Sequence, residues 1–585
     1  MYEDFLFYDI EVFKYNSMVV FKNFEGETIK VFSSSLDGLG DLLDKGIITE
    51  EGYSKLNDFI RDKTLVGYNN YFYDDFILYA MSKRKLNGFI KQWNDNIIQY
   101  KNNKNLMRVN NCRTLDAFQQ IDISNPSLKK IEGNMGKSII ESSISFDIDR
   151  ELTPSENYET FKYCEYDVGN TVEVFKMRLN YFETKRQIVK MLPKNKQDKG
   201  YKWNTTSIIG QILHSKKRMY PKRYVSDEMM SLVPTEVTDM WKQLDTWKKG
   251  DKFKVKSVSV EKHGVVFEFG WGGLHAVPKG FVRVKDVKLK DVTSMYPNIL
   301  INLNGLSDKT MDYKKILDTS TRLKHEGRKA ERAPYKLILN STYGLLNNDY
   351  SAIDNPHMAY SICIYGQIAL YVLCERLAAV GAKLINVNTD GVGYTIDNDL
   401  DESIVEDWEK EFKLSLETDY FKEWIQVAVN DYIAITDTGK IKVKGGDVNK
   451  YHDNRYFSNN DTRIISIAIV DYLTKGVPIQ ETIINNLDNP LLFQYILKAG
   501  HTYKGVVYKH DPDNVLNTTT NRIFAAKKGV EILKKRQDNG LVKFADAPSE
   551  MFLWNDDVSK IENFKDIVDK QWYYDLILKK LKRWQ

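Results

Sequence analysis

The stretch Lys336-Leu337-Ile338-Leu339-Asn340-Ser341-Thr342-Tyr343-Gly344 decides the fold assignment. It lies in a charged segment, residues 308–348, whose pattern predicts helix. Residues three or four apart share one face of a helix, so Lys336, Asn340 and Tyr343 point the same way. The chain therefore carries a cation, an amide and a phenol on a single helix face.

Three further cations precede this stretch at steps of four residues, namely Lys324, Arg328 and Arg332. A cationic stripe suits a triphosphate, whereas the plainer interpretation is a solvated helix face. Pro334 predicts an interruption of the helix, so these cations cannot share one straight face with Lys336.

Two aspartates flank the helical segment, and each follows strand-like sequence. Asp291 begins Asp-Val-Thr-Ser-Met-Tyr-Pro at 291–297, and Asp390 lies in Asn-Thr-Asp-Gly at 388–391, the turn of a hairpin predicted over 383–396. Nucleotide addition is a phosphoryl transfer that needs two carboxylates for two metal ions and cations for the triphosphate. These stretches together supply that set.

The N-terminal part of the chain carries a second group of acids. Asp9 and Glu11 lie two apart in a predicted strand and so face the same way. Asp74 belongs to a helical stretch, and Tyr163 and Asp167 lie one turn apart on another helix. Carboxylates that hold two divalent ions can activate water for phosphodiester hydrolysis.

The central stretches resemble the polymerase motifs of family B DNA polymerases, in the form found in bacteriophages and organellar plasmids. Residues 336–344 fit K-x-x-x-N-S-x-Y-G at every specified position. Residues 291–297 are similar to D-x-x-S-L-Y-P, and residues 388–391 are similar to D-T-D-S, with Asn388 and Gly391 departing from the pattern. The departure at Asn388 leaves the metal preference open.

This resemblance implies roles for individual residues. Asp291 and Asp390 would hold the two catalytic metal ions, and the Val292 carbonyl would also reach the metal. Tyr296 would lie under the incoming sugar and exclude a 2′-hydroxyl. The nucleotide-binding residues that the resemblance implies are Val292, Ser294, Tyr296, Lys324, Arg332, Lys336, Asn340 and Tyr343.

The N-terminal acids match, in order, the three exonuclease motifs of the same family, the last two being N-x-x-(F/Y)-D and Y-x-x-x-D. The resemblance implies a 3′→5′ exonuclease in which Tyr163 orients the attacking water. Its implied metal ligands are Asp9, Glu11, Asp74 and Asp167.

Several residues are expected to contact DNA by the same resemblance. Ser127-Leu128 begins Ser-Leu-Lys-Lys-Ile, which is similar to a motif that holds single-stranded DNA; a helix N-cap is the plainer interpretation of Ser127, and the two are compatible. Gly270-Trp271-Gly272-Gly273 resembles Y-x-G-G, whose glycines let the backbone approach template phosphates. The expected DNA contacts are Asn70, Ser127, Leu128, Gly272, Gly273, Tyr432, Lys442 and Lys444.

Composition limits the class of protein. The chain has 585 residues, too many for one compact core, with 42% hydrophobic and 28% charged residues and a net charge of +4. Its four cysteines show no zinc spacing, and the N-terminus is acidic where a signal peptide would be basic. The apolar stretch 359–385 is interrupted by polar residues and predicts a buried helix. We expect a soluble cytoplasmic protein, in the bacterial host if it is phage-encoded.

The predicted fold class is α/β and α+β multidomain: an RNase H-like exonuclease domain followed by a right-hand polymerase of palm, fingers and thumb. Residues 5–21 predict a strand–turn–strand unit, 36–62, 72–84 and 155–185 predict helices, and helical patterning dominates after 461. A basic cluster around Arg522 suits duplex phosphates, and a surface helix explains it equally well. The predicted domains are 1–185 exonuclease, 186–260 basic connection, 261–305 and 345–445 palm, 306–344 fingers and 446–585 thumb.

The predicted function is primer-dependent DNA synthesis with proofreading, using two Mg²⁺ ions per site or Mn²⁺ in their place. The expected partners are primer-template DNA, dNTPs and separate replication proteins (a helicase, a processivity factor, a single-strand-binding protein), with a monomeric enzyme and no membrane. The alternative is a protein-primed polymerase with a terminal protein, but the intervals 292–335 and 345–389 look too short for its insertions. A nuclease with a degenerate polymerase half, or a non-catalytic DNA-binding protein, would be expected to lack motif residues that this chain retains.

Overall fold

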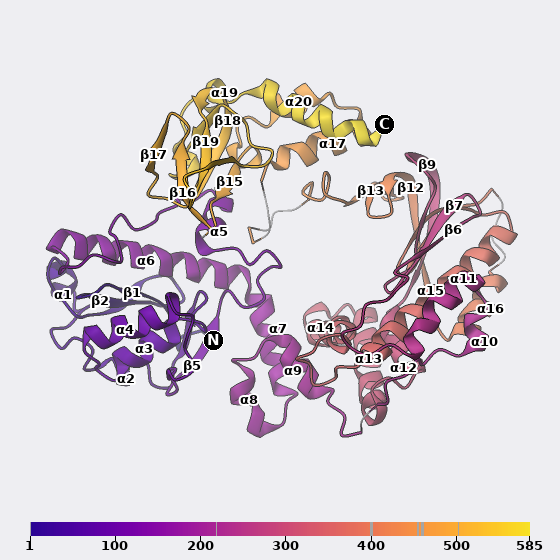
Figure 1. Cartoon of the computed structure of the whole chain (residues 1–585), viewed down its shortest axis with the longest axis horizontal. Helices are drawn as coiled ribbons and strands as arrows, with labels where there is room; N and C mark the ends of the chain where they lie inside the picture. The colour runs from indigo at the N-terminus through magenta and orange to yellow at the C-terminus, as the bar shows by residue number, and fades with distance from the viewer. Residues whose placement is uncertain (1, 218, 398–401, 453–455, 458–460, 501) are drawn as a thin grey trace.

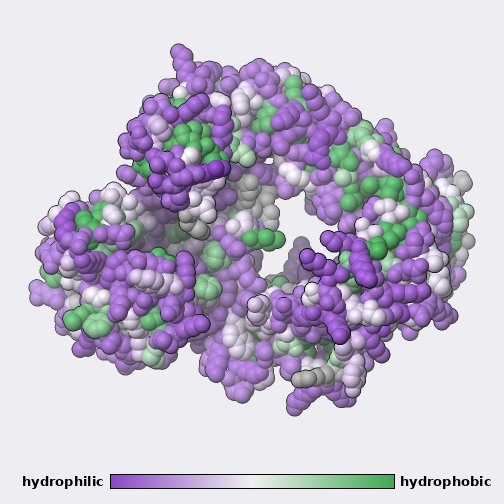
Figure 2. Space-filling model, viewed as in Figure 1, coloured by the Kyte–Doolittle hydropathy of each residue, from purple (hydrophilic) through white to green (hydrophobic). Residues whose placement is uncertain are grey.

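The computed structural model describes residues 2–585 except 218, 398–401, 453–455, 458–460 and 501. Its hydrophobic cores form three blocks along the chain: an N-terminal block with cores on both faces of one sheet, a middle block with core residues 188–414, and a C-terminal block with core residues 425–584. The blocks curve into an open ring (Figure 1). The space-filling view shows an opening in the middle, bordered mostly by hydrophilic residues (Figure 2).

The N-terminal block is built on a mixed five-stranded sheet in the order β3-β2-β1-β4-β5. The predicted strand–turn–strand unit is confirmed, because β1 pairs with β2 antiparallel; β1 also pairs with β4 parallel, which makes it an inner strand. Apolar side chains alternate to both faces and feed the two cores. The strands are β1 (Phe5–Val12), β2 (Ser17–Lys22), β3 (Thr28–Ser33), β4 (Thr64–Gly67) and β5 (Arg113–Asp116).

The helices of this block differ in part from prediction. A helix over 36–62 is wrong: only α1 (Gly40–Asp44) and α2 (Leu56–Phe59) form there, because Gly38, Gly46 and Gly52 adopt positive φ and break the segment. The remaining helices are α3 (Asp74–Ser82), α4 (Asn87–Ile98), α5 (Leu128–Asn134) and α6 (Pro154–Met177).

Helix α6 crosses the sheet and contacts β1 and β2. Thr153 and Glu156 form a capping box at its N-terminus, with Pro154 in the first turn. The helix predicted over 155–185 is divided at Arg178 into α6 and α7 (Leu179–Lys190).

The middle block holds a nine-stranded antiparallel sheet in the order β14-β13-β12-β9-β11-β10-β8-β7-β6. The hairpin predicted over 383–396 is confirmed as β10 and β11. The strands are β6 (Val258–Lys262), β7 (Val265–Phe269), β8 (His275–Val277), β9 (Val282–Val292), β10 (Lys383–Asn388), β11 (Gly391–Thr395), β12 (Leu416–Ala428), β13 (Asp431–Thr436) and β14 (Ile441–Lys444).

Helix α15 (Pro356–Ala379) packs against β10 and β11. Of the helices that the structure describes, it alone has the length and apolar composition of a membrane span, and 67% of its most apolar window is buried inside the protein. That burial agrees with the buried helix predicted from its interrupting polar residues. The neighbouring helices are α12 (Met295–Asn302) and α16 (Ser403–Phe412).

Helices α13 (Thr310–His325) and α14 (Lys329–Leu346) pack side by side. The interruption predicted at Pro334 is wrong, because α14 continues through that residue. The break lies earlier, at Gly327, whose φ is +70°. Lys324 and Arg332 therefore belong to different helices.

Residues 186–260, predicted as a connection, pack into the same core as the nine-stranded sheet. Ile188, Ile209 and Trp241 are each fully buried there. The helices are α7, α8 (Lys194–Gly200), α9 (Thr205–Ile212), α10 (Asp227–Met230) and α11 (Thr235–Trp241).

The predicted helical dominance after 461 is wrong. Helices α17 (Arg463–Lys475), α18 (Ile479–Asn485), α19 (Phe564–Ile567) and α20 (Lys570–Leu581) share one core with two small sheets, β15-β18-β21 and β17-β16-β19-β20. The strands are β15 (Tyr495–Lys498), β16 (Tyr503–Tyr508), β17 (Asp511–Val515), β18 (Thr520–Val530), β19 (Ile532–Arg536), β20 (Leu541–Lys543) and β21 (Met551–Leu553).

The C-terminal block is hydrogen-bonded to the segment that ends and follows α5. Arg522 of β18 is 0% exposed, and its guanidinium donates to the carbonyl oxygens of Gly133 (3.0 Å) and Lys137 (2.7 Å). The Ile139 amide donates to the Asn555 carbonyl at 2.7 Å. Arg522 therefore joins two blocks, and the expectation that it contacts phosphates is wrong.

Candidate active sites

Strands β9 and β11 bring Asp291 and Asp390 to one place. Asp291 lies next to the end of β9 and pairs in register with Gly391, the first residue of β11. The Val292 amide donates to the Asp390 carbonyl at 2.7 Å. Both carboxylates line one cavity of about 460 Å³.

The two carboxylates affect each other electrostatically. Burial and the Asp390 carboxylate raise the pKa of Asp291 to about 7, and burial also raises the pKa of Asp390. Such a pair is stabilised in its ionised form by a cation between the two groups.

The other wall of this cavity comes from α14 and the start of α12. Its lining residues include Ser294, Tyr296, Arg332, Lys336, Asn340 and Tyr343, together with Val292. Lys324 is not among them, because it pairs with Glu417 at 2.5 Å. Of the predicted nucleotide-binding residues, the structure brings all but Lys324 to the cavity.

A cysteine that the sequence did not single out connects two of these residues. The Tyr296 and Tyr343 rings lie 4.6 Å apart, and the Tyr343 hydroxyl lies 3.0 Å from the Cys363 sulfur. The Cys363 thiol also reaches the Tyr296 hydroxyl at 3.9 Å. Cys363 lies on α15, outside the motifs that contain Tyr296 and Tyr343, so no sequence motif indicates its contact with them.

The Gly270–Gly273 loop lies against the turn that carries Asp390. A Cβ on Gly273 would come within 2.7 Å of the Thr389 hydroxyl, so the approach requires glycine. The Gln367 amide holds the loop by donating to the carbonyls of Gly270 (3.0 Å) and Gly272 (2.8 Å). Gln367 is a second positioning residue without a sequence signal.

The structure accounts for the departure at Asn388. Its amide donates to the Asn430 side chain at 2.9 Å and to the Val429 carbonyl at 3.2 Å, bonds that an aspartate could not make. Gly391 leaves room for its neighbour, since a Cβ there would lie 3.1 Å from the Asp291 Oδ1.

The β13–β14 hairpin lies beside the two aspartates. Burial is the main cause that raises the pKa of Tyr432, and the charges of Asp291 and Asp390 raise it further. Tyr432 pairs in register with Lys444. Lys442 is bonded to Asp419 at 2.9 Å.

In the N-terminal block, one strand and two helices bring the predicted acids together. Asp9 and Glu11 come from β1, Asp74 begins α3, and Tyr163 and Asp167 lie on α6. All five side chains line one cavity of about 540 Å³.

These acids perturb one another strongly. Burial and the Asp167 carboxylate raise the pKa of Asp9 to about 7, while burial and neighbouring carboxylates raise the pKa values of Glu11 and Asp74 well above their ordinary range. Three buried carboxylates and the partly buried Asp9, without an equal positive charge, require a cation or protons.

Lys129, the first lysine of the Ser-Leu-Lys-Lys-Ile stretch, supplies part of that positive charge. Its ammonium pairs with Asp167 and lies 3.4 Å from Glu132. Burial lowers the pKa of Lys129, but the two carboxylates outweigh burial, so the pKa is raised and the side chain stays charged.

The predicted strand-binding residues have different environments. Ser127 occupies the N-cap position of α5 as expected, but its side chain makes no capping hydrogen bond, and its buried hydroxyl has no hydrogen-bond partner. Leu128 is partly buried in the core. Asn70 is 0% exposed and donates to Asp75 at 2.9 Å, so its expected contact with DNA is wrong in this conformation.

Both acid groups fit Mg²⁺, which takes oxygen ligands. Asp9, Glu11 and Cys164 have ligand atoms within 4.8 Å of one another, but burial raises the pKa of Cys164, so the protonated thiol leaves the carboxylates as ligands. The Asp74 Oδ1 is buried without a hydrogen-bond partner and is free to accept a cation.

Comparisons with known proteins give distant likeness to solved structures alone. No protein-family model and no curated protein matches the chain. Among solved structures, the chain is similar to the family B DNA polymerase from the hyperthermophilic archaeon Pyrobaculum calidifontis, with 13% sequence identity and a TM-score of 0.41 over 99% of this chain and 77% of that chain. This likeness is too distant to assign a family, so function has to be argued from the two sites.

Proposed function

We propose that the chain is a DNA-dependent DNA polymerase of the phage family B type with its own 3′→5′ exonuclease. One observation carries the proposal: Asp291 and Asp390 share a cavity with Arg332 and Lys336, so paired carboxylates face paired cations. This is the arrangement that phosphoryl transfer from a triphosphate needs.

In synthesis, Lys336 and Arg332 would bind the triphosphate, and Asn340 and Tyr343 would lie against the new base pair. Tyr296 would exclude a 2′-hydroxyl. Asp291 and Asp390 would hold two Mg²⁺ ions, whose chemistry would be to offset the negative charge of the phosphates and to lower the pKa of the attacking primer hydroxyl.

In proofreading, the four N-terminal acids would hold the ions for phosphodiester hydrolysis, and the Tyr163 hydroxyl would orient water. Lys129 pairs directly with Asp167 and so opposes the rise that burial causes in the pKa of Asp167. The Ser127 hydroxyl is buried without a partner, so it would have to become exposed on strand binding before it could form a hydrogen bond with the frayed primer strand.

The proposal includes extension of an ordinary primer by a monomer, with separate replication proteins as partners. Residues 310–346 form only the α13–α14 pair, and residues 356–379 form the single helix α15. Neither interval holds a further folded insertion of the kind that protein-primed polymerases carry, which favours extension of an ordinary primer over priming by a terminal protein.

A primer-extension gel with Mg²⁺ tests the proposal. The chain should lengthen a labelled primer on a template when dNTPs are present and shorten it from the 3′ end when they are omitted. No change in length under either condition would contradict the proposal. Extension only after a terminal protein is supplied would favour the alternative.

A further inference from the structure

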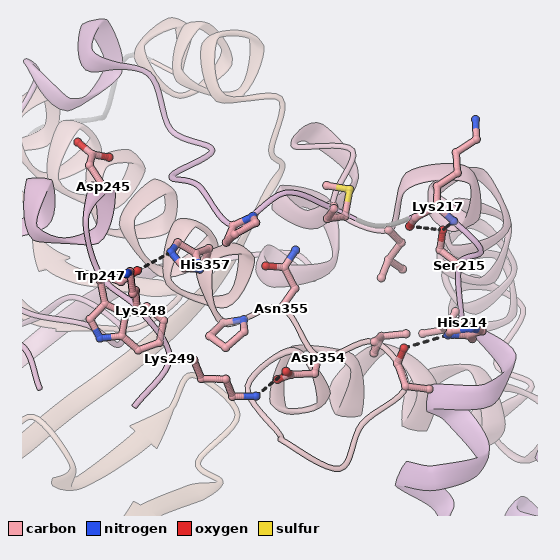
Figure 3. A pocket seen from close by; sticks show the side chains of 18 of the residues that line it. His214, Ser215, Lys217, Asp245, Trp247, Lys248, Lys249, Asp354, Asn355 and His357 are labelled. Carbon is pink, nitrogen blue, oxygen red and sulfur yellow. Dashed lines mark hydrogen bonds and ion pairs between the residues drawn. The ribbon is translucent and has the colours of Figure 1, made fainter. Parts of the chain in front are cut away.

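A cavity of about 940 Å³ lies apart from the two clusters of acidic residues described above (Figure 3). Four segments line it: residues 213–217 and 219–221 after α9, residues 245–249, Gly305–Leu306, and residues 352–357. Its volume is within the range of sites for small organic ligands.

The interior of this cavity is largely apolar. Leu213, Leu306 and Ile353 are buried, and Pro356 and Trp247 complete the walls. Trp247 is fixed by Phe253, whose ring stacks on it at 5.5 Å, and by the edge of His357 at 5.2 Å. The cavity therefore offers a rigid aromatic wall.

The rim is cationic. Lys217 and Lys248 line the cavity, and neither forms an ion pair with any residue in the described part of the chain. The acids at the rim are already paired: Asp245 binds Arg223 at 2.9 Å, and Asp354 binds Lys249 at 2.5 Å. Asp308, which does not line the cavity, is close enough to Lys217 for that lysine to help lower the pKa of Asp308. The charge facing the cavity is thus positive, but it is partly compensated at Lys217.

Asn355 adds a directed donor in the middle of the cavity, between the Trp247 wall and the Lys217 wall (Figure 3). Its Oδ1 accepts from the Met358 amide and caps α15, which leaves the buried Nδ2 with only a weak interaction with the Tyr224 hydroxyl. The positive end of α15 lies at the same place. A buried donor of this kind is satisfied by an acceptor on a ligand.

The walls argue for a small molecule rather than a peptide. They come from loops and helix ends, so they present neither a free strand edge nor a groove along two helices, the surfaces that bind extended and helical peptides. We propose that this cavity binds a small organic anion with a flat apolar body, its ring against Trp247 and its anionic group toward Lys217, Lys248 and Asn355.

The position of the cavity gives such a ligand a means of regulation. Gly305–Leu306 lead into α13, and residues 352–357 lead out of α14 to α15, so a ligand would contact both connections of the helix pair that carries Lys336. Bound there, it would restrain the pair and slow nucleotide incorporation without occupying the nucleotide site. This consequence rests on the proposed function, whereas binding itself does not.

Two dyes with the same rings test the binding site. The full chain, without DNA, is titrated with 1-anilinonaphthalene-8-sulfonate and with the uncharged N-phenyl-1-naphthylamine, and fluorescence is followed. The sulfonate should bind one site, at least about tenfold more tightly than the neutral dye, because two lysines face it. Lys217→Glu with Lys248→Glu should remove that difference, and Met219→Trp should weaken both dyes by filling the cavity.

The matched control is Lys440→Glu with Lys582→Glu, which changes net charge equally on exposed lysines elsewhere. Melting curves of all variants identify any that unfold. Equal affinity for the two dyes in the unaltered chain, or the same loss in the control pair, would overturn the proposal. Binding without slower primer extension would leave the site in place and remove its regulatory role.

Discussion

The Tyr343 hydroxyl lies 3.0 Å from the Cys363 sulfur, and the same thiol reaches the Tyr296 hydroxyl at 3.9 Å. Cys363, a buried side chain of α15, thus restrains both Tyr296, which is proposed to exclude a 2′-hydroxyl, and Tyr343, which is proposed to lie against the base pair. Because the two rings are also in contact, a shift of either ring moves the other.

Cys363→Ala should relax sugar selection. Removing the thiol frees the Tyr296 ring, so the preference for dNTPs over rNTPs should fall by about threefold to tenfold, the effect of one hydrogen bond. Single-nucleotide incorporation kinetics measure it, with Tyr296→Val as the reference that admits ribonucleotides. Cys374→Ala, a buried cysteine on the same helix, is the control. Unchanged selection in Cys363→Ala beside a large change in Tyr296→Val would contradict the role of the thiol.

Lys129→Met should reduce degradation of single-stranded DNA by about 10²-fold, because it removes a preorganised charge beside Asp167. Primer extension should be unchanged. Lys130→Met removes the same charge one residue along and should leave both activities near their original rates. Equal losses of degradation in the two variants would mean that only the overall charge of α5 matters.

Arg522→Met should destabilise the junction between the N-terminal and C-terminal blocks by about 3 kcal/mol, because it leaves buried carbonyls of Gly133 and Lys137 without donors. Chemical denaturation followed by fluorescence measures the loss. Lys527→Met, at an exposed position of the same strand, should change stability by less than about 0.5 kcal/mol. A variant at 522 that unfolds like the unaltered chain would contradict the assigned contacts.

Lys185 should make stability depend on pH. Burial lowers its pKa from 10.5 to about 7, so between these values the unfolded chain binds one more proton than the folded chain. Stability therefore rises with pH over that range, by about 1.4 kcal/mol per pH unit. Lys185→Met abolishes this dependence. The free energy of unfolding of the variant should therefore exceed that of the unaltered chain most below pH 7, and the difference should shrink toward pH 10. Parallel stability curves for the two proteins would contradict the assignment.

The sequence correctly predicted those elements in which the order of apolar and polar residues directly follows the burial of each side chain. The β1–β2 unit and the β10–β11 hairpin are of this kind, and short turns join the strands of each. Asp291 and Asp390 come together because the ends of β9 and β11 are adjacent in the sheet, where Asp291 pairs with Gly391.

The remaining features depend on contacts between distant segments, which no local pattern encodes. Arg522 lies in a basic run yet is buried, because its acceptors come from residues 133–137. Lys324 keeps the predicted spacing, but the turn at Gly327 directs it to Glu417 instead of the cavity. Cys363 and Gln367 act from α15, whose sequence predicts only a buried helix.

The central claim is that the chain contains two separate metal-dependent sites, one for synthesis and one for degradation. The most direct measurement compares Asp390→Ala and Asp9→Ala in primer extension and in degradation of single-stranded DNA, with melting curves to show that both are folded. We predict that Asp390→Ala loses synthesis and retains degradation, while Asp9→Ala does the reverse. Two folded variants that each lose both activities, or neither, would contradict the claim.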